Sequence, residues 1–346
     1  MEYRRLGSSG CIVSTLALGT MTFGTESDEA TSHSQLDAFF EAGGNLIDTA
    51  DVYSGAVSEE IIGRWLARQS GEVRSRVVLA TKGRFRTGSA PNDVGLSRRH
   101  LRAALHASLR RLGVDAVDLY QVHAHDPLTP PEETLSFLDD AVRAGDIAYV
   151  GLSNYTGWQL QQIVDVAELR SLVRPITLQP QYNLLVREIE WEIVPACLAN
   201  GLGLLPWSPL GGGWLTGKYA RETRPSGATR LGENPNRGVE AYDGRRSNER
   251  TWAVIDAVAA IAATRAVTMA QVALAWLVDR PGVSSVILGA RTLEQLKENL
   301  GAAGLHLTAD ERSALDTASD PAPADYPYGT AGTEQRARSL PPPQQP

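Results

Sequence analysis

The chain has 346 residues, of which 42% are hydrophobic and 21% are charged. Such a composition is globular and can bury a large core, and the length is ordinary for a single α/β barrel. The formal net charge of −7 at pH 7 argues against a general attraction to nucleic acid or to an anionic membrane surface.

The cysteine and targeting signals indicate the cytoplasm. Cys11 and Cys197 lie far apart and have no partner at metal-ligand spacing, which favours a reducing compartment. The segment MEYRRLGSSG contains no apolar core of a signal peptide, and no stretch approaches the roughly 20 apolar residues of a membrane span. We therefore expect a cytoplasmic protein without a membrane partner, and its oligomeric state stays open.

The order of the predicted elements is that of a barrel. Residues 3–14 predict a β-hairpin around a Ser8-Ser9-Gly10 turn, which we expect to close the bottom of the barrel. Apolar runs then alternate with helical patterns, and this alternation predicts parallel strands joined by crossover helices. Eight such units favour closure into a (β/α)8 TIM barrel. The runs are TLALGT, NLIDTA, VVLATK, VDLYQVH, IAYVGLSN, ITLQPQYN, LGLLPWSPL and VSSVILGA.

The clearest helical pattern covers residues 97–112, where Leu101, Leu105, Leu109 and Leu112 form one apolar stripe. The arginines opposite this stripe are expected to form a solvated face. An open dinucleotide-binding sheet is the rival fold, and it requires a G-x-G-x-x-G fingerprint after the first strand. The segment GTMTFG at that place does not fit the fingerprint.

The second half of the chain is less regular. A polar stretch, residues 221–248, follows the seventh run, and loops of that length are usually functional or disordered. Two helical patterns come next, at residues 250–265 and 268–279, and a last one covers residues 308–318. From Pro321 the chain is rich in proline, so we expect a tail that is mostly unfolded toward its end. The expected division is one barrel domain, residues 1–320, with extra helices, and a tail, residues 321–346.

Polar side chains stand at or just beyond the ends of three predicted strands. Asp48 and Tyr53 follow the second strand, Lys82 ends the third and His123 ends the fourth. An ionisable group at the mouth of an apolar strand costs free energy unless it is paired or used. Because parallel barrel strands end on one face, we expect these groups to converge there. A structural ion pair of Asp48 and Lys82 beside a loop tyrosine is the alternative.

These residue types together suit the delivery of a proton to a carbonyl oxygen. Tyrosine has a reference pKa of about 10, and a nearby ammonium such as that of Lys82 lowers this value. Asp48 would hold Lys82 charged and in place, and His123 would orient a substrate oxygen with a hydrogen bond. No side chain gives up a hydride, so this reading implies a nicotinamide cofactor.

Several motifs, in their order along the chain, resemble the aldo-keto reductases over about residues 3–320. The resemblance is to the bacterial NADP-dependent type. It implies that the protein reduces an aldehyde, a ketone or a keto-sugar to an alcohol, with Tyr53 as the proton donor and NADPH as the hydride source. Besides the strand that ends in Lys82, the motifs are GGNLIDTADVY, LYQVHAHD, GLSNY, QPQYNLL, PWSPLGGGWLTGKY and ILGARTLEQLKENL.

The resemblance also implies a cofactor site. Polar side chains after the fifth and sixth strands would hold the nicotinamide carboxamide, and the ring of Trp207 would lie against the nicotinamide. Glycine amides and Lys218 suit a pyrophosphate, and Arg291 at a helix start suits a 2′-phosphate, so NADPH is favoured over NADH. Core packing of Trp207 and a surface position of Arg291 are the alternatives. The expected cofactor residues are Gly19, Thr20, Met21, Asp48, Ser153, Asn154, Gln179, Trp207, Ser208, Pro209, Leu210, Gly213, Leu215, Gly217, Lys218, Gly289, Ala290, Arg291, Gln295, Glu298 and Asn299.

The substrate pocket is expected to combine the stretch 221–248 with aromatic and charged loop residues, a mixture that permits aldehydes, ketones and keto-sugars alike. These loop residues are Phe23, Arg84, Phe85, His125 and Tyr155.

Two other functions compete with a reductase. His123, His125 and Asp126 invite a metal-hydrolase interpretation, but a barrel hydrolase needs further ligands that the other strand ends do not offer, so no metal is expected. The second is an NADP(H)-binding sensor or regulatory subunit with little turnover. Channel-associated β subunits are similar to the same family, and all four site residues can persist in such a protein.

Overall fold

Eight parallel strands form the centre of the molecule. The computed structural model describes residues 1–346 except 228–229, 236–237, 324 and 338–346. Each strand coincides with one of the eight predicted apolar runs, β5 extending one residue beyond its run to Gly83, and the neighbour order is β10-β3-β4-β5-β6-β7-β8-β9. The bounds are β3 (Leu16–Gly19), β4 (Leu46–Asp48), β5 (Val78–Gly83), β6 (Val117–Val122), β7 (Ile147–Ser153), β8 (Thr177–Gln179), β9 (Gly203–Leu204) and β10 (Val286–Leu288).

Hydrogen bonds between the last two strand segments close the sheet into a barrel. The Ser284 N–H donates to the Leu204 carbonyl at 2.9 Å, and the Ile287 N–H donates to the Pro206 carbonyl at 3.0 Å. The strand β9 is short: Leu205 still donates to the Leu178 carbonyl at 2.9 Å, but Pro206 follows it and has no N–H to offer the ladder. The predicted (β/α)8 barrel fold is confirmed.

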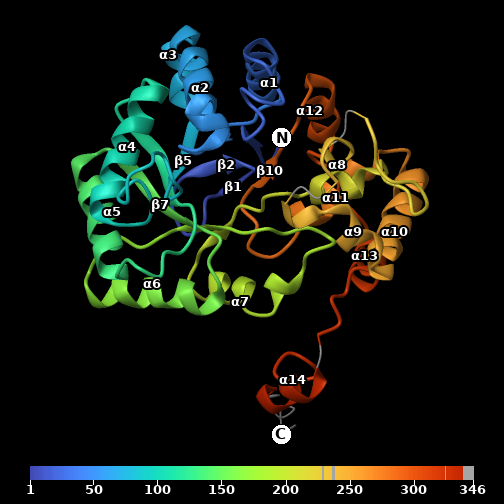
Figure 1. Cartoon of the computed structure of the whole chain (residues 1–346). Helices are drawn as coiled ribbons and strands as arrows, with labels where there is room; N and C mark the ends of the chain where they lie inside the picture. The colour runs from blue at the N-terminus through green and yellow to red at the C-terminus, as the bar shows by residue number, and fades with distance from the viewer. Residues whose placement is uncertain (228–229, 236–237, 324, 338–346) are drawn as a thin grey trace, which may run out of the picture.

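Helices surround the strands (Figure 1). In α4 the predicted stripe is buried, Ser97 caps the first turn by accepting from the His100 N–H at 3.3 Å, and Gly113 ends the helix with φ of 66°. The outer helices are α1 (Glu29–Glu41), α2 (Val57–Arg68), α3 (Gly71–Arg76), α4 (Arg98–Leu112), α5 (Pro131–Ala144), α6 (Gly157–Leu169), α7 (Ile193–Ala199), α11 (Met269–Val278) and α12 (Leu293–Leu300).

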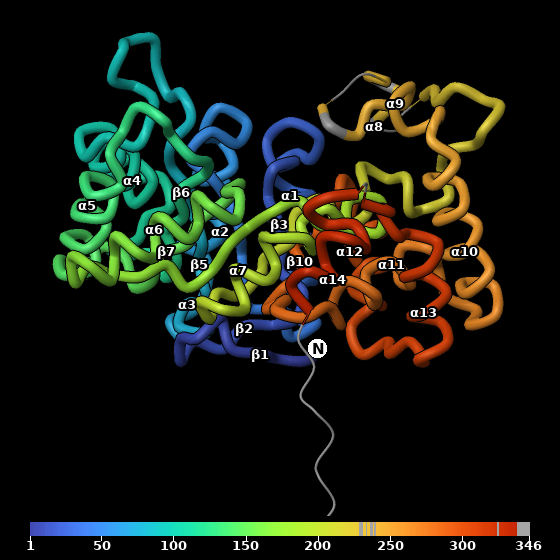
Figure 2. The backbone as a smooth tube through the Cα atoms, turned by 90° about the horizontal axis from the view of Figure 1, so that it is seen from below, coloured from blue at the N-terminus to red at the C-terminus, as the bar shows by residue number. Residues whose placement is uncertain are grey.

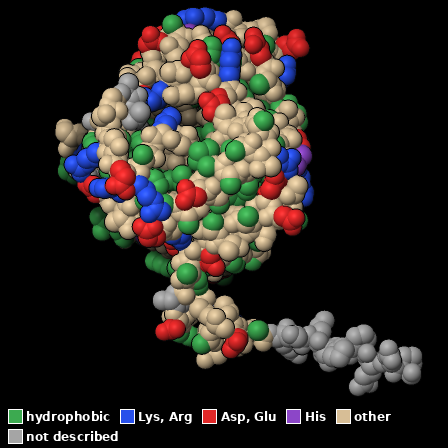
Figure 3. Space-filling view, turned by 90° about the vertical axis from the view of Figure 1, so that its right-hand side faces the viewer, with side chains coloured by type: hydrophobic (Ala, Val, Ile, Leu, Met, Phe, Trp, Pro, Cys, Tyr) green, Lys and Arg blue, Asp and Glu red, His purple; other side chains and the backbone are tan. Residues whose placement is uncertain are grey.

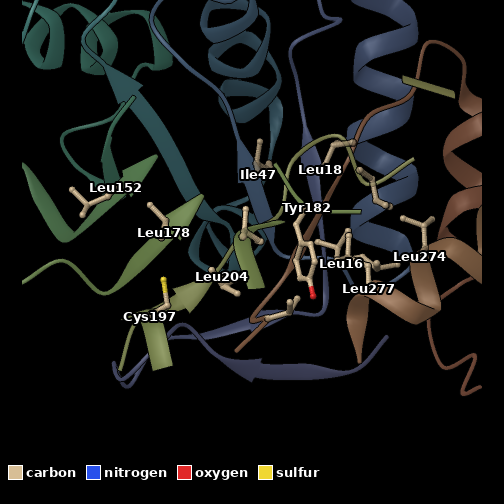
Figure 4. Close-up of a cluster of buried hydrophobic side chains, with 14 of the residues drawn as sticks. Leu16, Leu18, Ile47, Leu152, Leu178, Tyr182, Cys197, Leu204, Leu274 and Leu277 are labelled. Atoms are coloured by element: carbon tan, nitrogen blue, oxygen red, sulfur yellow. The ribbon is translucent and has the colours of Figure 1, made fainter. Parts of the chain in front are cut away.

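The main hydrophobic core lies between the strands and these helices. Leu16 and Leu18 of β3 belong to the same buried cluster as Leu274 and Leu277 of α11 (Figure 4). Close packing of two outer helices depends on Gly63 in α2, because a Cβ there would lie 2.2 Å from a backbone oxygen of α4. The strands are therefore packed against the surrounding helices along the outside of the barrel.

The hairpin of β1 (Tyr3–Arg5) and β2 (Ile12–Ser14) closes the bottom of the barrel, as predicted. Leu6 and Val13 pack there against Leu46, Leu119 and Leu205 in a second, smaller buried cluster. Figure 2 shows the hairpin at one end of the molecule and the short helices α8 (Arg230–Glu233) and α9 (Tyr242–Arg246) at the other.

The predicted helices of the second half are present as α10 (Glu249–Arg265), α11 and α13 (Ala309–Ala318). Short 3-10 turns, η1 (Tyr53–Ala56), η2 (Glu188–Glu190), η3 (Gly211–Thr216) and η4 (Gly238–Glu240), join other elements. Within the described residues no single helix is long and apolar enough to cross a membrane; α10 and α11 pass that test only as a pair, bent by 102°.

The segment after residue 321 differs in part from the expected unfolded tail. It contains α14 (Thr330–Arg336), which is labelled below the rest of the molecule in Figure 1, and Figure 3 shows a small lobe joined to the main body. The ring of Tyr328 stacks on that of Trp191 with centroids 5.3 Å apart, so an aromatic contact anchors the segment. The expected unfolded end, residues 338–346, lies outside the described residues.

Candidate active site

Asp48, Tyr53, Lys82 and His123 lie together at the carboxyl ends of β4, β5 and β6. The Lys82 ammonium donates to Asp48 Oδ2 at 2.6 Å, to the Thr49 carbonyl at 2.8 Å and to the Tyr53 hydroxyl at 3.2 Å. The ring of His123 meets that of Tyr53 edge-on at 5.9 Å. A buried ammonium is thus shared between a carboxylate and a phenol.

The turn after β4 brings Tyr53 back to this position. The Thr49 N–H donates to the Ala80 carbonyl at 2.9 Å and the Asp51 N–H to the Lys82 carbonyl at 3.1 Å, so the chain first follows β5 beyond the end of its own strand. The 3-10 turn η1 then starts at Tyr53, and Ala56, with φ of 81°, turns the chain into α2.

Two glutamines complete the surroundings of Asp48. The side-chain N–H groups of Gln121 and Gln179 each donate to Asp48 Oδ1 at 2.9 Å, and Gln179 also donates to Gln121 Oε1 at 3.1 Å. With Lys82 on Oδ2, both carboxylate oxygens are satisfied, which is what keeps a buried ion pair stable. Gln121 was not predicted from the sequence; the available signal was an amide inside an apolar strand, two residues before His123.

The pKa of Tyr53 lies above its usual value, contrary to the expectation from Lys82. Burial raises this pKa more than the neighbouring Lys82 charge lowers it, and Asp48 adds to the rise. For Lys82, burial is the largest single influence and acts to lower the pKa, but the charges of Asp48 and Tyr53 and their hydrogen bonds to the ammonium together outweigh it, so the pKa of Lys82 is raised. Near neutral pH the site therefore holds a protonated phenol, the state that a proton donor requires.

His123 is neutral near neutral pH. Burial, together with the charges of Lys82 and Arg84, lowers the pKa of His123 to about 2. A neutral imidazole has one N–H to donate. In the described part of the chain the Nδ1 of His123 has no hydrogen-bond partner. The ring of Phe85 lies edge-on to the imidazole ring, with the two centroids 4.5 Å apart. His123 can therefore bind a substrate oxygen without adding a charge.

A cavity of about 630 Å³ extends from Tyr53 and His123 to Arg291. Nearly all of the predicted cofactor residues line it. The two exceptions are Leu215, which is fully buried in the core, and Gly217. The lining residues that the sequence analysis did not predict are Thr22, Glu26, Gly212, Thr216, Tyr219, Glu240, Ala270, Ile287 and Leu288.

Hydrogen bonds position the polar groups in the part of the cavity nearest the tyrosine. Asn154 donates to the His123 carbonyl at 2.9 Å and accepts from the indole N–H of Trp207 at 3.1 Å. Ser153 Oγ donates to the Gln179 carbonyl at 2.9 Å. Asn154 has φ of 56°, a left-handed conformation that asparagine tolerates better than most residues. The indole is thus tied to the wall rather than packed in the core.

The far end of the cavity is built on the start of α12. Thr292 caps this helix by accepting from the Gln295 N–H at 3.3 Å, and the Arg291 N–H donates to Gln295 Oε1 at 3.0 Å. Arg291 Nε also lies 3.1 Å from Glu26 Oε2. Arg291 therefore faces the cavity and is not a free surface arginine.

Of the predicted substrate residues, two lie in the hydrophobic core and three lie in the loops near His123 and Tyr155. Phe23 is fully buried and Tyr155 is 2% exposed, and both belong to the hydrophobic core, so neither lines the cavity. Phe85 lies beside His123, His125 contacts Tyr155 ring to ring at 5.6 Å, and Arg84 donates to the His125 carbonyl at 3.2 Å. These three are not among the residues that line the cavity either, and a role in substrate binding stays a prediction for them.

Part of the stretch 221–248 reaches the cavity through Glu240, whose carboxylate is buried. This carboxylate accepts from Ser208 Oγ and from Arg245 Nε, each at 3.3 Å. Of the described residues in this stretch only Glu240 lines the cavity, directly beside the glycine run, since a Cβ on Gly212 would lie 2.9 Å from the Glu240 Cβ. Residues 228–229 and 236–237 lie outside the described residues.

The metal-hydrolase alternative finds no support in this geometry. Asp126 accepts from the Leu96 N–H at 2.8 Å and from the Thr129 hydroxyl at 2.7 Å, so its oxygens organise the surrounding loops. Among the residues that the structure describes, no group of three or more His, Cys, Asp or Glu side chains is arranged to hold a metal ion.

Comparison with known proteins identifies the family. Residues 15–320 match the model of the Aldo/keto reductase family. This chain belongs to the aldo/keto reductase family. Similar proteins include a probable voltage-gated potassium channel subunit beta of Oryza sativa subsp. japonica, 40% identical over 87% of this chain and 91% of that protein. An uncharacterized oxidoreductase of Bacillus subtilis is 36% identical over 89% and 92%, and the versiconal hemiacetal acetate reductase of Aspergillus parasiticus is 34% identical over 91% and 96%.

Membership of the aldo/keto reductases and the similarity to named oxidoreductases support an oxidoreductase that uses a nicotinamide cofactor. The site itself fits such a group. Amide and hydroxyl side chains stand near Tyr53, an arginine stands at the other end, and one continuous cavity joins them.

The second acid of the DTADVY motif, Asp51, lies outside the hydrogen-bonded group of Asp48, Lys82 and Tyr53. Both of its carboxylate oxygens are buried and without a hydrogen-bond partner in the described structure. Burial, together with the charge of Glu59, raises the pKa of Asp51 to about 7. Glu59 itself is paired with Arg111 at 2.6 Å and accepts from the Thr81 hydroxyl at 2.5 Å. Above this pKa, Asp51 therefore carries a buried charge without a hydrogen-bond partner among the described residues, which destabilises the folded protein.

Asp51→Asn is expected to stabilise the fold at pH 8 and to have little effect near pH 4. Between about pH 4 and the folded pKa of about 7, the folded protein keeps a proton that the unfolded chain has lost, so wild-type stability falls as pH rises through that window. At about 1.4 kcal/mol per pKa unit, the gain at pH 8 is about 2–4 kcal/mol. Urea denaturation of both proteins at the two pH values measures it, and equal gains at both would contradict the assignment.

Proposed function

We propose that this protein is an NADPH-dependent reductase that converts an aldehyde, a ketone or a keto-sugar to an alcohol. The observation that carries the proposal is the buried Lys82 ammonium, 2.6 Å from Asp48 and 3.2 Å from the Tyr53 hydroxyl, at one end of the cavity. A phenol in this position can give up its proton with an ammonium beside it to stabilise the phenolate that remains.

The chain's own residues bind and protonate the substrate oxygen. Tyr53 and His123 both line the cavity, so a carbonyl oxygen placed between them receives a hydrogen bond from each. When bound, a reduced nicotinamide supplies the hydride that the carbonyl carbon needs. Tyr53 transfers its proton to the oxygen as negative charge develops there, and the Lys82–Asp48 pair keeps the phenolate stabilised until a proton returns. Ser153, Asn154 and Gln179 would hold the carboxamide of the nicotinamide.

A panel of carbonyl substrates tests this proposal. Turnover is followed as the loss of NADPH absorbance with aliphatic and aromatic aldehydes, ketones and keto-sugars. Turnover of at least one compound that depends on Tyr53 supports the proposal. If no compound is turned over although NADPH binds, the second candidate replaces it.

That second candidate is an NADP(H)-binding regulatory subunit with little turnover. It is favoured by one observation, the 40% and 38% identity to proteins named as probable voltage-gated potassium channel beta subunits in Oryza sativa and Arabidopsis thaliana. Slow single-turnover oxidation of bound NADPH by an added aldehyde, which accepts the hydride, without steady-state turnover of any carbonyl, would favour it.

Arg291→Ala is expected to weaken NADPH binding about tenfold or more and to leave NADH binding nearly unchanged. The guanidinium faces the cavity at the start of α12, and the loss of a charge-assisted contact costs about 1.5–3 kcal/mol. Dissociation constants come from quenching of tryptophan fluorescence. Equal losses of affinity for NADPH and NADH would contradict the assignment of the 2′-phosphate to this end of the cavity.

A further inference from the structure

The arginine that we assign to the 2′-phosphate, Arg291, already forms an ion pair with the carboxylate of Glu26. Arg291 Nε and Glu26 Oε2 are 3.1 Å apart, and these side chains are only 24% and 13% exposed. Both residues line the cavity. A 2′-phosphate that binds Arg291 therefore arrives next to a negative charge of the same chain.

The backbone on each side of this ion pair is held in place. Thr22 Oγ1 donates to the Ala290 carbonyl at 2.9 Å, and Ser27 Oγ donates to the Arg291 carbonyl at 3.0 Å. The Glu26 N–H also donates to the Thr22 carbonyl at 3.0 Å. These two segments follow β3 and β10, which are neighbouring strands of the barrel. The Glu26 carboxylate is thus part of the built wall of the cavity.

The two cofactors respond differently to such a carboxylate. A phosphate monoester carries about −1.5 to −2 charges at neutral pH, so a nearby carboxylate repels it and competes with it for the guanidinium. A ribose 2′-hydroxyl is uncharged and can donate a hydrogen bond to a carboxylate. The same side chain therefore opposes NADPH and tolerates NADH.

We propose that Glu26 is a specificity-determining residue that reduces the preference for NADPH over NADH. The inference rests on the proposed assignment of Arg291 to the 2′-phosphate. Arg291 attracts the phosphate, Glu26 offsets part of that attraction, and the ratio of the two affinities is set by the pair rather than by the arginine alone.

Glu26→Gln tests the proposal, because it removes the charge and keeps the shape of the side chain. NADPH is expected to bind about tenfold more tightly, and NADH to stay within about threefold. Adenosine 2′,5′-bisphosphate and adenosine 5′-monophosphate differ only by the 2′-phosphate, so calorimetric titration with both isolates this end of the cavity. In Glu26→Gln the affinity for the bisphosphate should increase, and the affinity for the monophosphate should stay unchanged.

Matched variants separate the pair from a general charge effect. Glu294→Gln removes an exposed carboxylate from the first turn of α12, outside the cavity lining, and should leave the ratio of the two affinities unchanged. Thermal melting checks that each variant folds, and Glu26→Ala provides a second removal of the same charge.

The outcomes also distinguish this inference from the proposed function. If Arg291→Ala weakens NADPH selectively but neither Glu26 variant tightens it, the role of Glu26 is wrong and the 2′-phosphate assignment stands. If Arg291→Ala does not weaken NADPH selectively, the assignment of the 2′-phosphate is wrong and the inference fails with it.

Discussion

Tyr53→Phe is expected to lower kcat by about 10²–10⁴-fold, because it removes the only group proposed to protonate the carbonyl oxygen. The hydroxyl accepts one hydrogen bond, from Lys82 at 3.2 Å, while Lys82 keeps its bonds to Asp48 and to the Thr49 carbonyl. The substitution therefore leaves the ion pair and the fold in place. The loss should fall mainly on kcat, and the dissociation constant of NADPH should stay within a few-fold.

Tyr120→Phe is the matched control for this experiment. Tyr120 is fully buried on β6, the strand next to β5, and its hydroxyl has no hydrogen-bond partner in the described residues. Removing this hydroxyl should change kcat by less than a few-fold. A Tyr53→Phe protein that reduces a good aldehyde at near the wild-type rate would refute the mechanism, whatever its cofactor.

Lys82→Met is the second change with a large expected effect, and it should lower both activity and stability. The methionine fills much of the same space but carries no charge, so the phenolate of Tyr53 loses its stabilising neighbour and kcat falls by about 10²–10⁴-fold. The Asp48 carboxylate, 3% exposed in its side chain, loses its counter-ion. Breaking a buried ion pair in this way costs about 3–5 kcal/mol of unfolding free energy.

The double variant Asp48→Asn with Lys82→Met separates these two effects. It contains no unpaired charge, so much of the stability should return while kcat stays low. A pH profile supplies a further test, because alcohol oxidation needs deprotonated Tyr53. Burial raises the pKa of Tyr53 and the charge of Lys82 lowers it. The loss of Lys82 should therefore shift the pH at which the oxidation rate rises to a higher value. Recovery of kcat in the double variant, or an unshifted profile, would contradict the role of Lys82.

The sequence was sufficient for the barrel and for the place of its chemistry. Each of the eight apolar runs became a parallel strand, because period and length alone separate buried strands from amphipathic helices. Asp48, Lys82 and His123 could be located for the same reason, since the carboxyl ends of parallel strands lie on one face. Even the bottom hairpin followed from its local turn residues.

The tertiary structure alone decided the properties that depend on distant neighbours. Gln179 reaches Asp48 across 131 positions of the chain, and Glu26 reaches Arg291 across two neighbouring barrel strands, which no local pattern encodes. The direction of the Tyr53 pKa shift is another case: from sequence the ammonium of Lys82 predicts a lowering, but burial outweighs it. Burial is a property of everything packed around a group, so it becomes known only when the chain has folded.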